Sequence, residues 1–277
     1  MEACKYVINY NTEAKTPFEI IPIGDIHLGD TDCDIAKLKE TINYIKKTPR
    51  CYTILMGDMG NYFSPNDKRF DSDKVDILLR TPEAQFKEVI RLFKPIRHKI
   101  IAVLEGNHEA SSKNLGLFDF SRNLAHDLEC NYGGYACFIE LSFRRQVKLT
   151  EKAKDKWRGM TGFGAKRVVI FATHGSGCSG RVGSKMNKLE EYSKNIEADI
   201  YLQAHNHSLS VSPMIKLICN KGVIIEKNTV CVNTGTFLKT WTKGKGSYAE
   251  NKGYLPAKTG VAHIYINPRY NILTARI

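Results

Sequence analysis

The sequence predicts an α/β fold, and the order of its apolar segments carries that prediction. In the first half, strand-like apolar runs alternate with segments of helical spacing. Three of these strands end in a cluster of polar residues, and the second half is richer in strands. Since no repeat, low-complexity tract or linker marks a boundary, we expect one domain spanning residues 1–277.

The elements of the first half follow from apolar periodicity and from capping residues. Asp34 is suited to cap the first helix, and Pro82 is suited to the first turn of the second. The predicted elements are a strand at 18–23, a helix at 35–45, a strand at 52–56, a helix at 82–93, a strand at 99–104 and a helix at 115–128. In open α/β sheets, ligands bind at the carboxyl ends of strands. The polar residues after these three strands are therefore candidates for a functional site.

The second half contains short apolar runs typical of strands. They lie at 136–143, 167–173, 200–204, 209–218, 223–232, 261–266 and 270–275, with one predicted helix at 185–196. Two long loops rich in basic residues are expected at 144–166 and 239–259. The first begins with Arg144 and Arg145, and the second contains Trp241 among its lysines.

Composition is typical of a globular protein without a membrane segment. Of 277 residues, 42% are hydrophobic and 25% charged, and no apolar run approaches the roughly 18 residues that a membrane span needs. The amino-terminal segment does not resemble a signal peptide. Eight cysteines form no C-x-x-C pair and mostly lie in apolar runs. We therefore expect reduced thiols, a cytoplasmic setting and no membrane partner.

The chain is basic, with 41 lysines and arginines against 29 acidic residues and a net charge of +12. One interpretation is a solvated basic surface. The other is attraction to a polyanion such as nucleic acid or a nucleotide. Composition alone leaves both interpretations open.

Five polar clusters carry the chemistry. They are Asp25-Ile26-His27, Gly57-Asp58-Met59-Gly60-Asn61, Gly106-Asn107-His108-Glu109, Thr173-His174-Gly175 and His205-Asn206-His207. Taken alone, the clusters at Asp25, Asp58 and His174 are more often structural than ligand sets, whereas the paired His205 and His207 are a stronger metal signal. On a strand, alternate side chains share a face, so Asp25 and His27 are expected to point at the same ion. Five of the eight histidines fall in these clusters, and that joint placement predicts a metal site.

Taken in order, the clusters resemble those of the calcineurin-like metallophosphoesterases. That family's pattern is D-x-H, G-D-x-x-D/N, G-N-H-D/E, a lone H and G-H-x-H, which this chain matches between Asp25 and His207. Ala204 stands where the family usually has glycine. The segment 232–236 resembles a late turn of the family, with Thr234 in place of a frequent proline.

The resemblance implies a two-sheet β-sandwich flanked by helices and a dinuclear metal centre. Carried over by position, one ion is held by Asp25, His27, Asp58 and His207, and the other by Asp58, Asn107, His174 and His205. Asp58 thus bridges the ions. Mixed nitrogen and oxygen donors suit Mn, Fe, Ni or Zn better than Ca or Mg, and we expect Mn. His108 resembles the family's general acid, and Asn61, where relatives often have Asp, is expected to orient it.

The family resemblance further implies hydrolysis of phosphate esters by metal-activated water. Residues 25–29 most resemble the DNA-repair nuclease branch, so we expect a phosphodiesterase acting on nucleic acid or a nucleotide. Substrate contacts are expected from Arg144, Arg145, Trp241 and, in a glycine-rich run, Arg181. Two alternative hypotheses stay open: a phosphomonoesterase acting on protein or a small phosphate ester, and a catalytically silent nucleic-acid-binding module. The sequence does not predict the oligomeric state.

Overall fold

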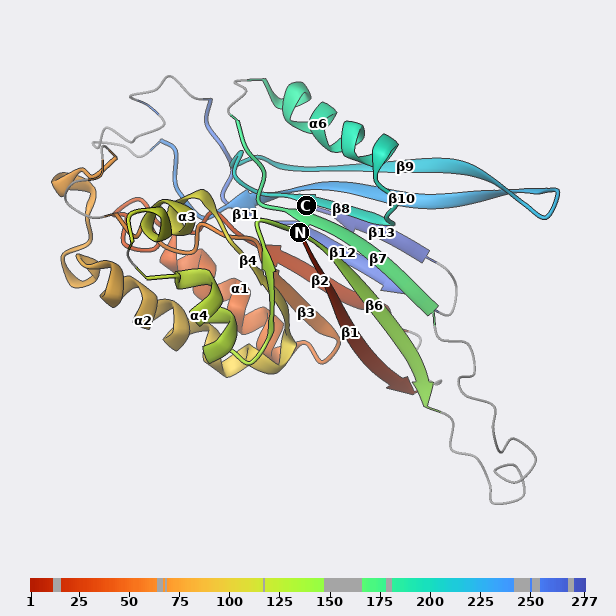
Figure 1. Cartoon of the computed structure of the whole chain (residues 1–277), viewed down its shortest axis with the longest axis horizontal. Coiled ribbons are helices and arrows are strands. Elements are labelled where there is room, and N and C mark those ends of the chain that lie inside the picture. Colours follow the sequence, from red (N-terminus) through yellow and green to blue (C-terminus); the bar gives the residue numbers. More distant parts are fainter. Residues whose placement is uncertain are drawn as a thin grey trace, which may run out of the picture.

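Two β-sheets packed face to face, with helices on their outer faces, make up the fold (Figure 1). The computed structural model describes residues 1–11, 16–63, 67, 69–116, 118–146, 166–177, 181–241, 250, 255–268 and 272–277. Over these residues the predicted α/β sandwich flanked by helices is confirmed.

The strands in chain order are β1 (Glu2–Asn11), β2 (Phe18–Ile23), β3 (Cys51–Leu55), β4 (Ile100–Leu104), β5 (Asn131–Gly134), β6 (Ala136–Gln146), β7 (Lys166–Thr173), β8 (Ile200–Gln203), β9 (Leu209–Asn220), β10 (Val223–Thr236), β11 (Gly260–Val261), β12 (His263–Asn267) and β13 (Ile272–Arg276). The α-helices are α1 (Ile35–Lys47), α2 (Pro82–Phe93), α3 (Asn107–Asn114), α4 (Phe120–Asp127) and α6 (Val182–Asn195). Short 3-10 helices are η1 (Ser72–Lys74), η2 (Ile77–Leu79) and η3 (Lys94–Lys99).

Parallel pairing within each sheet sets the direction of the strands that matter for the site. In the described residues one sheet has the order β1-β6-β7-β8-β10-β11, with β9 paired to β10, and the other has the order β13-β12-β2-β3-β4-β5. β2, β3 and β4 run parallel in the second sheet, and β7, β8 and β10 run parallel in the first. Each set therefore presents its carboxyl ends together.

The main hydrophobic core lies between the sheets, where Ile20 and Ile54 pack in one cluster with Ile139 and Ile170. Helices α1, α2 and α4 pack against the outer face of the six-stranded sheet. Helix α6 covers β7, β8 and β10 on the other side (Figure 1). β2 is buried along its whole length, which explains why all its residues except Glu19 are apolar.

Several predicted elements coincide with the observed ones, and one is wrong. β2 and α2 have the predicted bounds, and Asp34 caps α1 by accepting a hydrogen bond from the backbone N–H of Lys37. The helix expected at 115–128 is shorter, because α4 begins only at Phe120, and the preceding helix α3 (Asn107–Asn114) was not predicted. Gly116 adopts a φ of 74° between them, and Asp119 caps α4.

The described chain contains no helix long and apolar enough to cross a membrane. The seven cysteines that the structure describes are free, as predicted, and most are buried; Cys178 lies outside the described residues.

Candidate metal centre

All five polar clusters meet at one edge of the sandwich. The side chains come from the segments after β2, β3, β4, β7 and β8. Three groups of donor atoms each lie within 4.8 Å of one another: Asp25, His27 and His207; His27, Asp58 and His108; and Asp58, His174 and His205. The carboxyl ends of both parallel strand sets thus supply one compact donor cluster.

Most of the predicted ligands have left-handed backbone. The φ angles are 48° at Asp25, 52° at His27, 52° at Asp58, 67° at His205 and 50° at His207. Residues other than glycine rarely adopt this conformation, and each such residue costs on the order of 1–3 kcal/mol. The expectation that strand alternation aligns Asp25 with His27 is therefore wrong, because β2 ends at Ile23 and the two residues lie in a strained loop.

Backbone contacts between loops hold these conformations. The N–H groups of Ile26 and His27 both donate to the carbonyl oxygen of Asp58, at 2.9 and 3.1 Å. A Cβ atom on Gly106 would lie 2.3 Å from both the backbone nitrogen and Oδ1 of Asp58. Only glycine fits at this approach, so the glycine of the G-N-H motif has a steric explanation.

Asp25, His27 and His207 form the first donor group. His27 Nε2 and His207 Nε2 face each other at 3.0 Å. Burial lowers the pKa of His27 to about 3 and also lowers the pKa of His207, so both rings are neutral at pH 7. Asp25 Oδ2 is buried and has no hydrogen-bond partner. Two neutral imidazoles beside a carboxylate oxygen without a partner fit a divalent cation.

The second donor group centres on Asn107 and His174. His174 Nδ1 donates to the carbonyl oxygen of Met56 at 2.8 Å, which turns Nε2 toward Asn107 Oδ1 at 3.1 Å and Asp58 Oδ2 at 3.3 Å. His205 Nδ1 lies 2.7 Å from the same Asn107 oxygen. Burial lowers the pKa of His174, but the negative charge of Asp58 outweighs this effect and raises the pKa to about 10. The negative charge of Asp58 that favours a proton on His174 also favours a cation at this position.

Asp58 lies between the two donor groups. Its loop is held by Glu109, a residue to which the sequence assigned no function. The backbone N–H groups of Asp58 and Met59 donate to the carboxylate of Glu109 at 3.0 and 2.8 Å, and Gly106 N–H donates to it at 3.1 Å. Glu109 is buried. The acidic residue that closes the G-N-H-E motif was the available signal for this contact.

His108 lies beside Asp58, and Asn61 contacts it in an unexpected way. His108 Nε2 is 3.9 Å from Asp58 Oδ2, and His108 Nδ1 faces the backbone carbonyl of Asn61 at 3.2 Å. The side chain of Asn61 instead pairs with His27 Nδ1 at 3.2 Å and donates to Asp30 at 3.3 Å. The amide therefore orients a predicted ligand, and the expected side-chain contact with His108 is wrong.

The two departures from the family pattern, Ala204 and Thr234, are both buried, and the Thr234 hydroxyl has no hydrogen-bond partner among the described residues. Ala204 is buried and directly precedes the left-handed His205. Thr236, at the end of β10, donates its hydroxyl to the carbonyl oxygen of Asp25 at 2.9 Å. The late turn therefore supports the first donor group through the backbone of Asp25.

Two of the predicted substrate-binding residues belong to segments at the metal edge. Arg181 is exposed and precedes α6, whose Lys185 donates to the carbonyl oxygen of Asn206 between the paired histidines. Trp241 is 49% exposed and follows β10.

Arg144 and Arg145 lie at the other end of the sheet, contrary to expectation. Ala136 of β6 pairs with Thr173, next to His174, whereas Arg144 is eight positions further along β6. At about 3.4 Å per residue, that places Arg144 roughly 27 Å away. Residues 147–165 and most of the second basic loop, 242–249 and 251–254, lie outside the described residues.

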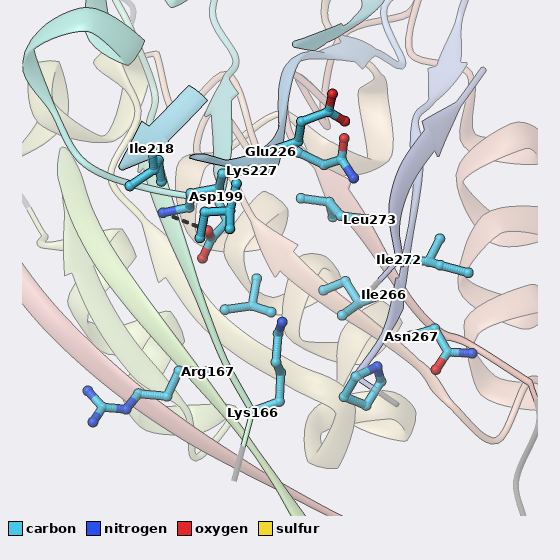
Figure 2. Close-up of a pocket in the computed structure, with 14 residues that line it drawn as sticks. Lys166, Arg167, Asp199, Ile218, Glu226, Lys227, Ile266, Asn267, Ile272 and Leu273 are labelled. Carbon is cyan, nitrogen blue, oxygen red and sulfur yellow. Dashed lines mark ion pairs between the residues drawn. The ribbon is translucent and has the colours of Figure 1, made fainter. Parts of the chain in front are cut away.

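A cavity of about 240 Å³ also lies at this opposite end, where β7 begins. Figure 2 shows its lining, including Arg167 and Ile272, and the ion pair between Asp199 and Lys227 at 3.0 Å. It contains none of the predicted ligands. The donor cluster is therefore the stronger candidate for the reactive centre.

The family model for calcineurin-like phosphoesterases matches residues 18–209. Vacuolar protein sorting 29 from Cryptosporidium parvum is a similar solved structure, with 11% identity, a TM-score of 0.40, and coverage of 95% of this chain and 97% of that one. A metallophosphoesterase from Sphaerobacter thermophilus has 10% identity, a TM-score of 0.36, and coverage of 93% and 87%. No curated protein sequence matches the chain.

Proposed function

Because the chain belongs to the calcineurin-like phosphoesterase family, we propose that it hydrolyses phosphodiester bonds in nucleic acid or a nucleotide. Family membership gives the broader class, a phosphoesterase hydrolase. The observation that carries the proposal is the convergence of seven predicted donor residues, with Asp58 shared between two groups and His108 beside them.

The donor set favours two divalent transition-metal ions. We assign the first to Asp25, His27, Asp58 and His207, and the second to Asp58, Asn107, His174 and His205. Imidazole together with carboxylate and amide oxygen suits Mn, which we expect, or Fe, Ni and Zn. When bound, such a pair supplies an activated water and neutralises charge on the phosphoryl oxygens.

The residues of the chain then supply orientation and a proton. Glu109 fixes the loop of Asp58, and the Asn61 amide fixes the ring of His27. His108 donates a proton to the leaving oxygen as the P–O bond breaks. Burial lowers the pKa of His108 to about 4. An anionic substrate within about 4–6 Å favours the protonated ring, so the proton becomes available when substrate binds.

Basic and aromatic side chains near the metal edge support a nucleic acid or nucleotide substrate. Arg181 is suited to a phosphate and Trp241 to stacking on a base. The net charge of +12 favours anionic partners generally. We also propose that residues 1–277 form one domain, since β1 and β13 belong to the same two sheets as the central strands.

A substrate panel tests the proposal. The Mn-loaded protein is assayed on bis(4-nitrophenyl) phosphate, 4-nitrophenyl phosphate, single- and double-stranded DNA, RNA and cyclic nucleotides. We expect kcat/KM to be higher for the diester than for the monoester. A preference for the monoester above about tenfold, equivalent to about 1.4 kcal/mol in transition-state binding, contradicts the diesterase proposal.

A further inference from the structure

A row of side chains in ring contact runs from the predicted metal centre to a cationic side chain outside the predicted site. The ring centroids of His27 and His108 are 4.6 Å apart, and those of His108 and Phe63 are also 4.6 Å apart. The guanidinium carbon of Arg69 lies 4.4 Å from the centroid of Phe63. Arg69 therefore ends a row that begins at a predicted metal ligand and passes through the proposed acid.

Asp67 holds this arginine in place. Arg69 Nε donates to Asp67 Oδ1 at 3.0 Å and Nη2 donates to Oδ2 at 2.8 Å, while the backbone N–H of Arg69 donates to Oδ1 at 2.9 Å. The Asp67 side chain is only 11% exposed, whereas that of Arg69 is 32% exposed. The guanidinium is thus anchored on one edge and still reaches solvent.

The anchored guanidinium retains donors for a ligand. A guanidinium has five N–H groups, and the two side-chain bonds to Asp67 use two of them. Within the described part of the chain, the other three have no acceptor. Its planar face on Phe63 and its fixed fork are features that suit arginine, rather than lysine, to bidentate binding of a phosphate.

The position of Arg69 relative to His108 determines which part of a substrate Arg69 contacts. His108 is the proposed donor to the leaving oxygen, and Phe63 is the only ring between it and Arg69 among the described contacts. The two groups therefore lie close enough to act on the same half of a substrate.

We propose that Arg69, held by Asp67 and Phe63, binds an anionic group carried by the leaving group of the substrate. This subsite selects phosphate esters whose leaving group bears a second phosphate, as in an oligonucleotide. The inference rests on the proposed function, because it uses the role of His108 there. It adds a determinant of substrate choice at a residue outside the family motifs.

Three thymidine dinucleotides test the subsite: one without terminal phosphate, one with a 5′ phosphate and one with a 3′ phosphate. Whichever ester oxygen leaves, one terminal phosphate lies on the leaving half and the other on the retained half, which serves as the internal control. A charge-assisted hydrogen bond contributes about 1.5–3 kcal/mol, and partial exposure weakens it. We expect a leaving-half phosphate to raise kcat/KM by about tenfold in the wild type.

The variants R69Q and R69K separate binding from loop structure. R69Q should reduce the tenfold preference for the leaving-half phosphate to about one, while R69K should keep part of that preference. R144Q, at the far end of the sheet, controls for the lost charge. An equal loss on all three substrates, or a preference that survives R69Q, overturns the inference.

If the dinucleotides are not cleaved, that result counts against the proposed function and not against the Arg69 subsite. The subsite is then tested by equilibrium binding. Isothermal titration calorimetry of the Mn-loaded protein compares thymidine 3′,5′-bisphosphate with the two thymidine monophosphates. The bisphosphate should bind about tenfold more tightly than either monophosphate, and R69Q should remove that advantage. Equal affinities in the wild type, or an advantage unchanged in R69Q, overturn the subsite.

Discussion

Individual residues at the centre have separable functions even though they lie within a few ångströms. His108 and Asn61 illustrate this, since both were expected to act as one catalytic pair. The Asn61 amide contacts His27, a predicted ligand, and only the Asn61 carbonyl faces His108. The His108 ring also belongs to a donor group with His27 and Asp58, so its role as acid rather than ligand needs a direct test.

The substitutions His108→Ala and Asn61→Ala should have opposite signatures. Loss of a general acid costs about 10²–10⁴ in rate, and substrates with poor leaving groups should be slowed most. Loss of a group that orients a ligand costs about 10–100-fold in metal affinity. Metal content by mass spectrometry and kcat on a series of phenyl esters measure both effects. Loss of metal in His108→Ala would instead assign His108 as a ligand.

For individual residues, the sequence indicates which side chains are candidate ligands better than it indicates the backbone conformation that positions them. The residue types and order of the five clusters suffice to select the side chains that the structure brings together, because carboxylates and imidazoles in that order are uncommon. The left-handed backbone at Asp25 and His27 could not be predicted, since it is imposed by hydrogen bonds to a loop distant in sequence. Arg69 lies in an aperiodic segment, where no pattern indicates its contact with Phe63.

Buried polar contacts connect elements on the outer face of the six-stranded sheet. Glu19 of β2 accepts a hydrogen bond from Tyr44 of α1 at 3.0 Å and pairs with His263 Nδ1 of β12 at 2.6 Å. Burial raises the pKa of Glu19, but the bonds from His263 and Tyr44 outweigh it and leave the pKa below its ordinary value. The ionised carboxylate is therefore favoured in the folded state.

This depressed pKa predicts acid-dependent stability. The contribution of Glu19 is fully present above its unfolded pKa, near 4.5, and is lost as pH falls through the lower folded value. At pH 6, Glu19→Gln should lower the free energy of unfolding by about 1–2 kcal/mol. Urea unfolding of both proteins between pH 6 and pH 3 should show the difference shrinking toward pH 3. A difference that stays constant over this range contradicts the assignment.

Among the elements, strongly periodic segments were predictable and weakly patterned ones were not. β2 and α2 combine a clear apolar period with capping residues, and their bounds agree with the structure. β1 was missed because it is an edge strand whose fully buried side chains are Cys4 and Ile8 alone. The predicted start of a helix at residue 115 was wrong because the left-handed Gly116 lies directly after α3, and α4 begins only at Phe120.

On the scale of the whole molecule, the sandwich explains why ligands far apart in sequence meet. Both sheets present the carboxyl ends of their parallel strands at one edge, so loops after β2, β3, β4, β7 and β8 converge there. Positive charge is not confined to this edge, since Arg144 lies at the opposite end. Net charge therefore supports an anionic partner in general, whereas Arg69, Arg181 and Trp241 are the local candidates for selecting one.

The central claim is that these loops hold two metal ions with Asp58 between them. Anomalous diffraction at the manganese absorption edge, on crystals soaked with Mn²⁺, tests it directly. We predict two peaks about 3.5–4 Å apart, with the Asp58 carboxylate contacting both. A single peak, or two peaks of which only one contacts Asp58, would contradict the dinuclear assignment.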